Sequence, residues 1–265
     1  MGSGPAGDFV ASYRRHDAGA EHELVVILNG ASADSPAGRE LLGEFAEIVP
    51  HRLLALPAPA LDLGAYLQAA ALLEHERICF LNSYAAPLAD GWLAALAGAL
   101  EEEGVGIAGA TGSWESQAEW RRGSLRHRPR QLAALHDRSA YPRFPNPHLR
   151  TSSFVIARGL LLELALEQPA DKREAYLLES GRASITARIQ QRGLRAVVVG
   201  RDGRSYDTED WPASNTFRSG GQENLLVADN QTRDYRDASP RRRRRLARDS
   251  WGSAAYASSA ATGRG

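Results

Sequence analysis

An amide, a hydroxyl and a phenol stand at the point where an apolar run ends: residues 78–81 are followed directly by Asn82, Ser83 and Tyr84. The apolar run predicts a buried strand, so these three side chains would lie at its carboxyl end. They can exchange hydrogen bonds with a polar ligand, but they offer none of the carboxylates that hard divalent cations prefer. The stretch therefore predicts a polar binding site and leaves any metal ligands unknown.

Two other predicted strands also run into polar residues. Residues 23–28 are followed by Asn29, and residues 105–109 are followed two positions later by Thr111. Strands and amphipathic helices alternate through this part of the chain, which favours an α/β fold with a mostly parallel, Rossmann-like sheet flanked by helices. In such folds ligands bind beyond the carboxyl ends of the strands. We therefore expect Asn29, Asn82 and Thr111 to share one edge of the sheet.

Charge and cysteine content argue against several classes of protein. Lys and Arg together number 32, as do Asp and Glu, so no global positive field would draw the chain to nucleic acid. Cys79 is the single cysteine, which excludes an intramolecular disulfide and a cysteine-ligated zinc cluster. No apolar stretch approaches the ~20 residues of a membrane-spanning helix, and the amino terminus lacks the apolar core of a signal peptide. We expect a cytoplasmic protein.

Residues 1–252 are expected to form one domain. Hydrophobic periodicity fades between residues 111 and 150, where Trp, Arg, Pro and His accumulate, as is typical of an active-site insertion. A helix is predicted over residues 182–192, followed by a strand over residues 194–199. Residues 201–252 then form an irregular, aromatic-containing C-terminal arm. The Gly/Ser/Ala-rich residues 253–265 are expected to be a disordered tail.

The sequence FLNSYAAPLADGWLAAL, residues 80–96, resembles a region of nucleotide-sugar glycosyltransferases that have the GT-A fold. Further stretches resemble a bacterial, family 2-like branch of these enzymes. They are GATGSWES at 109–116, FPNPHLRTSSFVIAR at 144–158, LESGR at 178–182 and QENLLVADNQT at 222–232. The resemblance covers roughly residues 8 to 252. It implies a nucleotide-sugar donor and, as acceptor, a cell-surface glycan or a lipid-linked sugar.

The sequence departs from that family at two places. The family carries an Asp-x-Asp element that binds Mg²⁺ or Mn²⁺ beneath the diphosphate. Here Asn82, Ser83 and Tyr84 occupy the comparable positions, so the resemblance implies donor binding there while the need for a cation stays open. The family also begins with a strand that holds the nucleotide base, and no such strand precedes Glu23.

Glu179 is the candidate catalytic base. Inverting sugar transfer needs a group that deprotonates the acceptor hydroxyl, and in the GT-A family this is a carboxylate in a motif before a late helix. Glu179 is the acid nearest to that place in the sequence. The alternative is that Glu179 only forms an ion pair with Arg182, which is itself a candidate acceptor-binding residue.

Four further residues have both a functional and a structural interpretation. Arg150 could bind donor phosphate bidentately, and His148 could contact the acceptor, although a salt bridge or a cap would explain them equally well. Trp114 could stack on a sugar ring or lie buried beneath the insertion. Asp229 could close over the donor, but a turn cap is the favoured interpretation.

An unbroken run of five arginines, from Arg241 to Arg245, follows Pro240. It predicts the first turn of a basic helix that could touch anionic lipid at the inner face of a membrane, with a solvated helix face as the alternative. A second possibility also stands for the chain as a whole. The absent Asp-x-Asp element and the absent first strand suit a non-catalytic GT-A-like module that binds a glycan or a partner.

Overall fold

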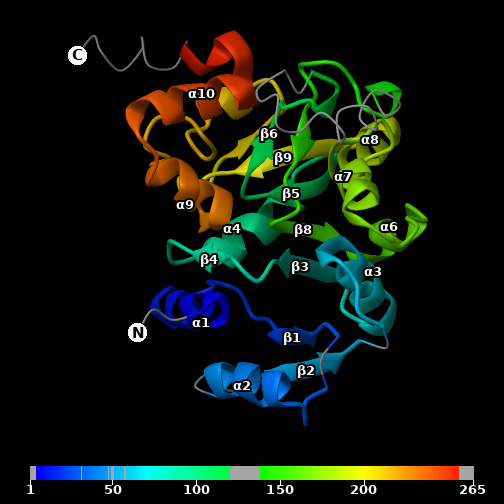
Figure 1. Ribbon diagram of the computed structural model, residues 1–265. Helices are drawn as coiled ribbons and strands as arrows, with labels where there is room; N and C mark the ends of the chain where they lie inside the picture. The colour runs from blue at the N-terminus through cyan, green and yellow to red at the C-terminus, as the bar shows by residue number, and fades with distance from the viewer. Residues whose placement is uncertain are drawn as a thin grey trace, which may run out of the picture.

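The computed structural model describes residues 4–30, 32–46, 48, 51–56, 58–119 and 138–256. These residues form an α/β structure in which helices lie on both faces of a mixed, five-stranded sheet (Figure 1). The predicted α/β class is therefore confirmed. Residues 120–137 of the predicted insertion and residues 257–265 of the predicted tail lie outside the described residues.

The central sheet has the strand order β10-β9-β5-β8-β3. Its strands are β3 (Arg77–Leu81), β5 (Val105–Gly109), β8 (Ser153–Ala157), β9 (Arg195–Val199) and β10 (Ser205–Tyr206). β8 runs antiparallel to both of its neighbours, β3 and β5, whereas β5 and β9 pair in parallel. The prediction of a mostly parallel sheet is therefore wrong. β3, β5 and β9 do point the same way, but β8 comes back in the opposite direction after the 111–150 segment and separates β3 from β5.

Alternating side chains of these strands build a core on each face of the sheet. Phe154 and Ile156 are buried on the face covered by α3, α6 and α8, while Val155 is buried on the face covered by α4. The bounds of these helices are α3 (Asp62–Leu72), α4 (Trp92–Ala99), α6 (Arg158–Glu163) and α8 (Ile185–Gln191). Because both faces are covered, β8 reads as a continuous apolar run.

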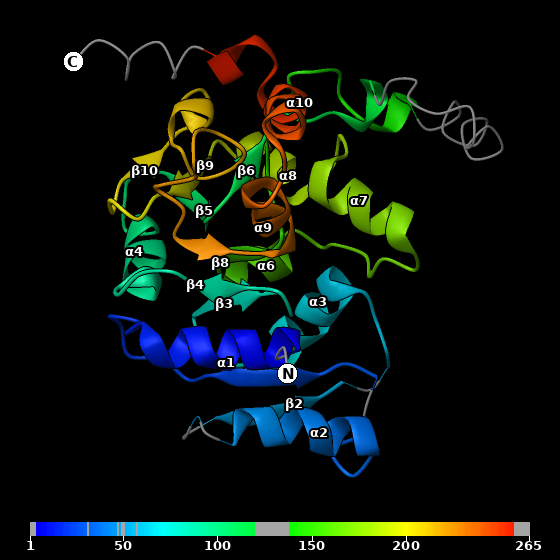
Figure 2. The same ribbon diagram turned by 60° about the vertical axis from the view of Figure 1, so that its left-hand side comes forward.

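A second, two-stranded sheet lies beyond β3. It consists of β1 (Val25–Leu28) and β2 (Arg52–Ala55), which pair in parallel and are joined by α2 (Pro36–Phe45). α2 begins with a side-chain cap: the Ser35 side chain accepts a hydrogen bond from the Gly38 amide at 3.0 Å, and Pro36 takes the first helical position. α1 (Pro5–Arg15) lies along β1, on the side towards the central sheet (Figure 2).

The C-terminal arm is less irregular than predicted. It contains α9 (Asn230–Arg236) and α10 (Pro240–Trp251), and the predicted basic helix after Pro240 is confirmed. Trp211 and Trp251 are almost fully buried, so the arm contributes to the main core. The helix predicted over residues 182–192 is shorter in the structure, and α7 (Lys172–Ser180) precedes it.

The remaining elements are short. They are β4 (Ala86–Pro87), β6 (Gly112–Ser113), β7 (His148–Leu149) and β11 (Val227–Ala228), with the 3-10 turns η1 (Gln117–Glu119), η3 (Arg138–Ala140), η4 (Trp211–Ala213) and η5 (Gly252–Tyr256). β11 pairs with β4, which ties the arm to the loop after β3, and β6 pairs with β7. None of the described helices is both long and apolar enough to cross a membrane.

Replacing Leu96 by alanine tests the packing of α4 on the sheet. Leu96 is completely buried, so Leu96→Ala should lower the free energy of unfolding by about 2–5 kcal/mol, through lost apolar burial and the cavity left behind. Leu72, at the end of α3, is 50% exposed, and Leu72→Ala should change the free energy by less than about 0.5 kcal/mol. Urea unfolding of both variants compares them; equal losses would contradict this placement of α4.

Candidate functional site

The loop after β3 lies at the edge of the sheet where β3 and β5 end and β8 begins. The Asn82 amide donates a hydrogen bond to the Ser152 carbonyl at 2.9 Å, and the Asn82 side chain accepts one from the Tyr84 amide at 3.0 Å. Ser83 and Tyr84 are exposed. The amide side chain of Asn82 therefore shapes the loop, and the hydroxyl and the phenol face solvent.

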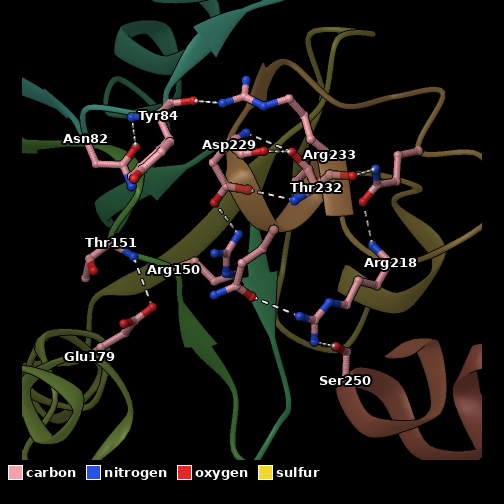
Figure 3. A network of polar contacts seen from close by, with 12 residues as sticks. Asn82, Tyr84, Arg150, Thr151, Glu179, Arg218, Asp229, Thr232, Arg233 and Ser250 are labelled. Carbon is pink, nitrogen blue, oxygen red and sulfur yellow. Dashed lines mark hydrogen bonds and ion pairs between the residues drawn. The ribbon is translucent and has the colours of Figure 1, made fainter. Parts of the chain in front are cut away.

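The C-terminal arm reaches the same loop. Arg233, on α9, donates a hydrogen bond from Nη2 to the Tyr84 carbonyl at 2.8 Å (Figure 3). Asp229, the N-cap of α9, accepts a hydrogen bond from the Thr232 amide at 2.8 Å, and its own amide donates to the Thr232 hydroxyl at 2.7 Å. This capping box confirms the interpretation of Asp229 as a cap.

A buried ion pair joins the arm to the sheet. Arg150 Nη1 lies 2.7 Å from Asp229 Oδ2, and the two side chains are only 8% and 2% exposed. The guanidinium carbon of Arg150 also lies 4.4 Å from the centroid of the Phe217 ring. The Arg150 amide donates to the Thr111 carbonyl at 3.0 Å, which fixes the arginine beside β5. Arg150 is therefore held from three directions.

Electrostatics keep Asp229 ionised. Burial alone raises the pKa of Asp229, but the charge of Arg150 and the hydrogen bond from the Thr232 amide outweigh it, so the pKa falls below its ordinary value. A carboxylate so placed is a strong partner for the guanidinium. Removing either partner would leave an uncompensated charge in the core.

Glu179 lies on the other side of Arg150 (Figure 3). It sits in the last turn of α7 and precedes α8, the late helix before which the sequence places it. The residue as a whole is partly exposed, but its carboxyl group is desolvated and accepts a hydrogen bond from the Thr151 amide at 3.4 Å. Burial raises the pKa of Glu179 by more than the nearby Arg150 charge lowers it.

Arg182 does not form the ion pair with Glu179 that was the alternative to a catalytic role of Glu179. Its Nε donates to the Ser139 carbonyl at 2.6 Å and its amide donates to the Ala140 carbonyl at 2.9 Å. The exposed Arg182 thereby anchors the turn η3, and the positive charge that acts on Glu179 is that of Arg150.

A second buried arginine, Arg218, was not predicted as a site residue. Its guanidinium carbon lies 4.8 Å from the centroid of the Phe217 ring, on which Arg150 also lies. It donates to Gln231 Oε1 at 2.9 Å and to the Ser250 hydroxyl at 3.2 Å (Figure 3). Burial lowers the pKa of Arg218, and the nearby Glu115 carboxylate opposes that effect. In the sequence, Arg218 could have been recognised only as an arginine directly after an aromatic residue in a polar arm, and that pattern is too weak to predict a site residue.

Trp114 and His148 lie in the 111–150 segment, and both side chains contact other residues of the protein. Trp114 Nε1 donates to the Thr208 carbonyl at 2.9 Å, and its ring meets Trp251 edge-on at 5.9 Å between centroids. His148 Nδ1 lies 2.8 Å from the Asn146 carbonyl. Burial lowers the pKa of His148 to about 4, so the imidazole is neutral at pH 7.

Asn29 lies apart from the ion pair, whereas Thr111 lies beside Arg150. The side chain of Asn29 clamps Ala60: Nδ2 donates to the Ala60 carbonyl at 2.6 Å, and Oδ1 accepts from the Ala60 amide at 2.8 Å. Thr111 is 1% exposed, and its carbonyl supports Arg150. Asn29, Asn82 and Ser83 do share one feature, because all three line a cavity of about 520 Å³ between β1 and β3.

The donor set at this edge does not fit the divalent cation that the resemblance implies. The loop after β3 offers an amide, a hydroxyl and a phenol, and the carboxylates of Asp229 and Glu179 already bind Arg150 and Thr151. Across the part of the chain that the structure describes, no group of three or more His, Cys, Asp or Glu side chains could hold a metal ion.

No protein-family model matches the chain, and no curated protein matches it closely enough to indicate a relationship.

Replacing Asp229 by asparagine tests the buried ion pair without removing the cap, because asparagine can still accept the hydrogen bond from Thr232. Asp229→Asn should lower the free energy of unfolding by about 3–5 kcal/mol, since it leaves the Arg150 charge unpaired in the core. The control is Asp234→Asn, which breaks the exposed Arg242–Asp234 pair and should cost less than about 1 kcal/mol. Equal losses in chemical denaturation would contradict the special role of the buried pair.

The buried imidazole of His148 should make stability fall in mild acid. Its pKa is about 4 in the folded protein against 6.5 for an unperturbed histidine, so between these values the unfolded chain binds a proton that the folded chain does not. The wild type should therefore lose about 2 kcal/mol more than His148→Asn between pH 7 and pH 5. Denaturation curves at several pH values check this. Parallel pH profiles of the two proteins would show that His148 carries no such linkage.

Proposed function

We propose that the protein is an inverting glycosyltransferase that moves a sugar from a nucleotide-sugar donor to a cell-surface glycan or a lipid-linked acceptor. The observation that carries the proposal is that a strand end with polar side chains and a desolvated carboxylate lie at the same edge of the sheet. Asn82, Ser83 and Tyr84 follow β3, and Glu179 lies against Thr151 at the same edge of the sheet. The sequence resemblance to GT-A enzymes supports the same assignment.

Glu179 has the properties that a general base needs. A base works best when its pKa approaches the working pH, and burial raises the pKa of Glu179 towards that range. In the reaction the carboxylate takes the proton of the acceptor hydroxyl while the acceptor oxygen bonds to the anomeric carbon. The bond from that carbon to the diphosphate breaks with its electron pair, and a nucleoside diphosphate leaves.

The positive charge available to the diphosphate would come from arginines. Arg233 already bonds to the Tyr84 carbonyl, so its guanidinium lies beside the proposed donor loop and is only partly buried. Arg150 is nearer to Glu179, but Asp229 neutralises it. Donor binding would therefore depend on Arg233 and on the exposed Ser83 and Tyr84 side chains, with Arg150 in a supporting position.

The basic helix α10 fits an acceptor that is presented at a membrane surface. Of its five consecutive arginines, Arg242 pairs with Asp234 at 2.7 Å and Arg243 donates to the Tyr235 carbonyl at 3.1 Å, both on α9. Arg241, Arg244 and Arg245 are exposed and would supply the contact with anionic lipid.

One observation favours a second candidate, a non-catalytic module that binds a glycan or a partner protein. Arg150 and Asp229, the two most buried charged residues of the edge, satisfy one another rather than facing solvent. A binding module keeps such a pair as a support for its surface. The two candidates differ in whether Glu179 takes part in chemistry.

Titration calorimetry with UDP-, GDP- and dTDP-sugars, with and without Mn²⁺, tests donor binding directly. We expect one nucleotide class to bind, and Glu179→Gln to leave its affinity unchanged while lowering the transfer rate by at least about 100-fold, the usual effect of removing a general base. The wild-type rate should rise with pH as Glu179 loses its proton, and the variant should lack that rise. The exposed Glu163→Gln is the matched control. Absence of binding to every donor would favour the non-catalytic module.

A further inference from the structure

A pocket of about 360 Å³ lies between α1 and the C-terminal arm. Its lining comes from one face of α1, from the short sheet of β4 and β11 and from α9, and Figure 1 shows α1 and α9 on opposite sides of β4. The volume is within the range of about 300–1,000 Å³ that is usual for small-molecule sites. Asn82, Ser83 and Glu179 do not line it, so the pocket is distinct from the proposed donor loop and base.

The floor of the pocket is apolar. Ala86 of β4 and Ala228 of β11 are paired across the short sheet, and Leu225 forms one hydrophobic cluster with them, against which Leu88 packs. All four residues line the pocket. An apolar group that entered the pocket would therefore leave water for an existing apolar surface.

Arginines from two helices stand around this floor. Arg15 lies on α1, on the same helix face as Asp8 and Ala11, because these positions are three or four residues apart. Arg233 and Arg236 lie on α9, three residues apart, and they also share a face. The pocket is thus lined by guanidinium groups from both of the helices that border it.

The positive charge of these arginines is only partly compensated. Among the described residues that line the pocket Asp8 is the only acid, and Asp237, outside the pocket, binds Arg236 through hydrogen bonds of 2.8 and 3.2 Å. Arg233 donates to a neutral carbonyl, and the exposed Arg15 has no ion-pair partner among the described residues. Even with both acids counted, one positive charge is in excess. An anion is the complementary ligand.

Hydrogen bonds fix the walls of the pocket without a ligand. The Ser12 hydroxyl donates to the Pro87 carbonyl, which ties α1 to β4. Gln222 is 8% exposed, and its Nε2 donates to the Thr232 carbonyl at 3.0 Å, which ties α9 to the loop before β11. Because its walls are already held in place, a ligand would spend little free energy on ordering them.

We propose that this pocket binds a small organic phosphate, with its phosphate group between Arg15 and Arg233 and its apolar body on Ala86 and Leu225. A phosphate monoester offers three acceptor oxygens, so it can bind guanidinium groups from both helices, whereas a carboxylate offers two oxygens and suits a single guanidinium. The volume has no room for the two chains of a phospholipid, so the ligand is a soluble molecule. The proposal does not rest on the glycosyltransferase activity.

Titration calorimetry of the full chain with hexyl phosphate tests the proposal. We expect hexyl phosphate to bind at least about tenfold more tightly than hexanol or inorganic phosphate, because hexanol lacks the anion and inorganic phosphate lacks the apolar body. At ten times its dissociation constant, hexyl phosphate should slow amide exchange in Asn230–Arg236 about tenfold. Phosphatidylglycerol vesicles should not compete with it; competition would overturn the assignment to a soluble ligand.

Variants of α1 test where the ligand lies, and they leave unchanged Arg233, which also serves the proposed donor loop. Arg15→Gln should weaken the binding of hexyl phosphate about tenfold or more, through the loss of charge-assisted hydrogen bonds. The matched control is Arg201→Gln, which removes an exposed arginine outside the pocket and should bind like the wild type.

A blocking variant tests the apolar part of the pocket. Ala11 lines the pocket and is exposed, so the ring added by Ala11→Phe should occupy the space and abolish binding, while the Tm stays close to that of the wild type. Three results would overturn the proposal: no binding of hexyl phosphate to the wild type, equal binding by Arg15→Gln and Arg201→Gln, or undiminished binding by Ala11→Phe.

Discussion

The ion pair between Arg150 and Asp229 is the interaction on which the arrangement of the sheet edge depends. Because the pair is almost completely buried, the free-energy cost of its desolvation is offset only if the two charges lie in good geometry and their remaining donors and acceptors are also paired. Arg150 lies between β7 and β8, while Asp229 begins α9 in the C-terminal arm. The pair therefore decides where the arm sits, and with it the contact of Arg233 with the Tyr84 carbonyl.

The same charge balance sets the properties of Glu179. Arg150 cannot fully compensate two carboxylates in a desolvated space, and Asp229 lies in direct contact with it while Glu179 does not. The pKa of Asp229 is lowered and that of Glu179 is raised, which is the division of roles seen wherever two acids occupy unlike environments. A carboxyl group with a raised pKa near a fixed anion follows from the packing of the arm.

The sequence predicts local features well and long-range pairings poorly. The strand before Asn82 and the basic helix after Pro240 depend on neighbouring residues, and the structure confirms them. The antiparallel course of β8 depends on how the chain returns after residue 150, which no local pattern encodes. The partnership of Arg150 with Asp229 likewise joins two distant motifs, each of which was visible separately.

The cavity between β1 and β3 lies beside the proposed donor loop. Asn29, Asn82 and Ser83, which follow β1 and β3, line its end. A donor that contacts residues after both strands would have to fix the separation of β1 and β3, and the free energy spent on that ordering would reduce its affinity.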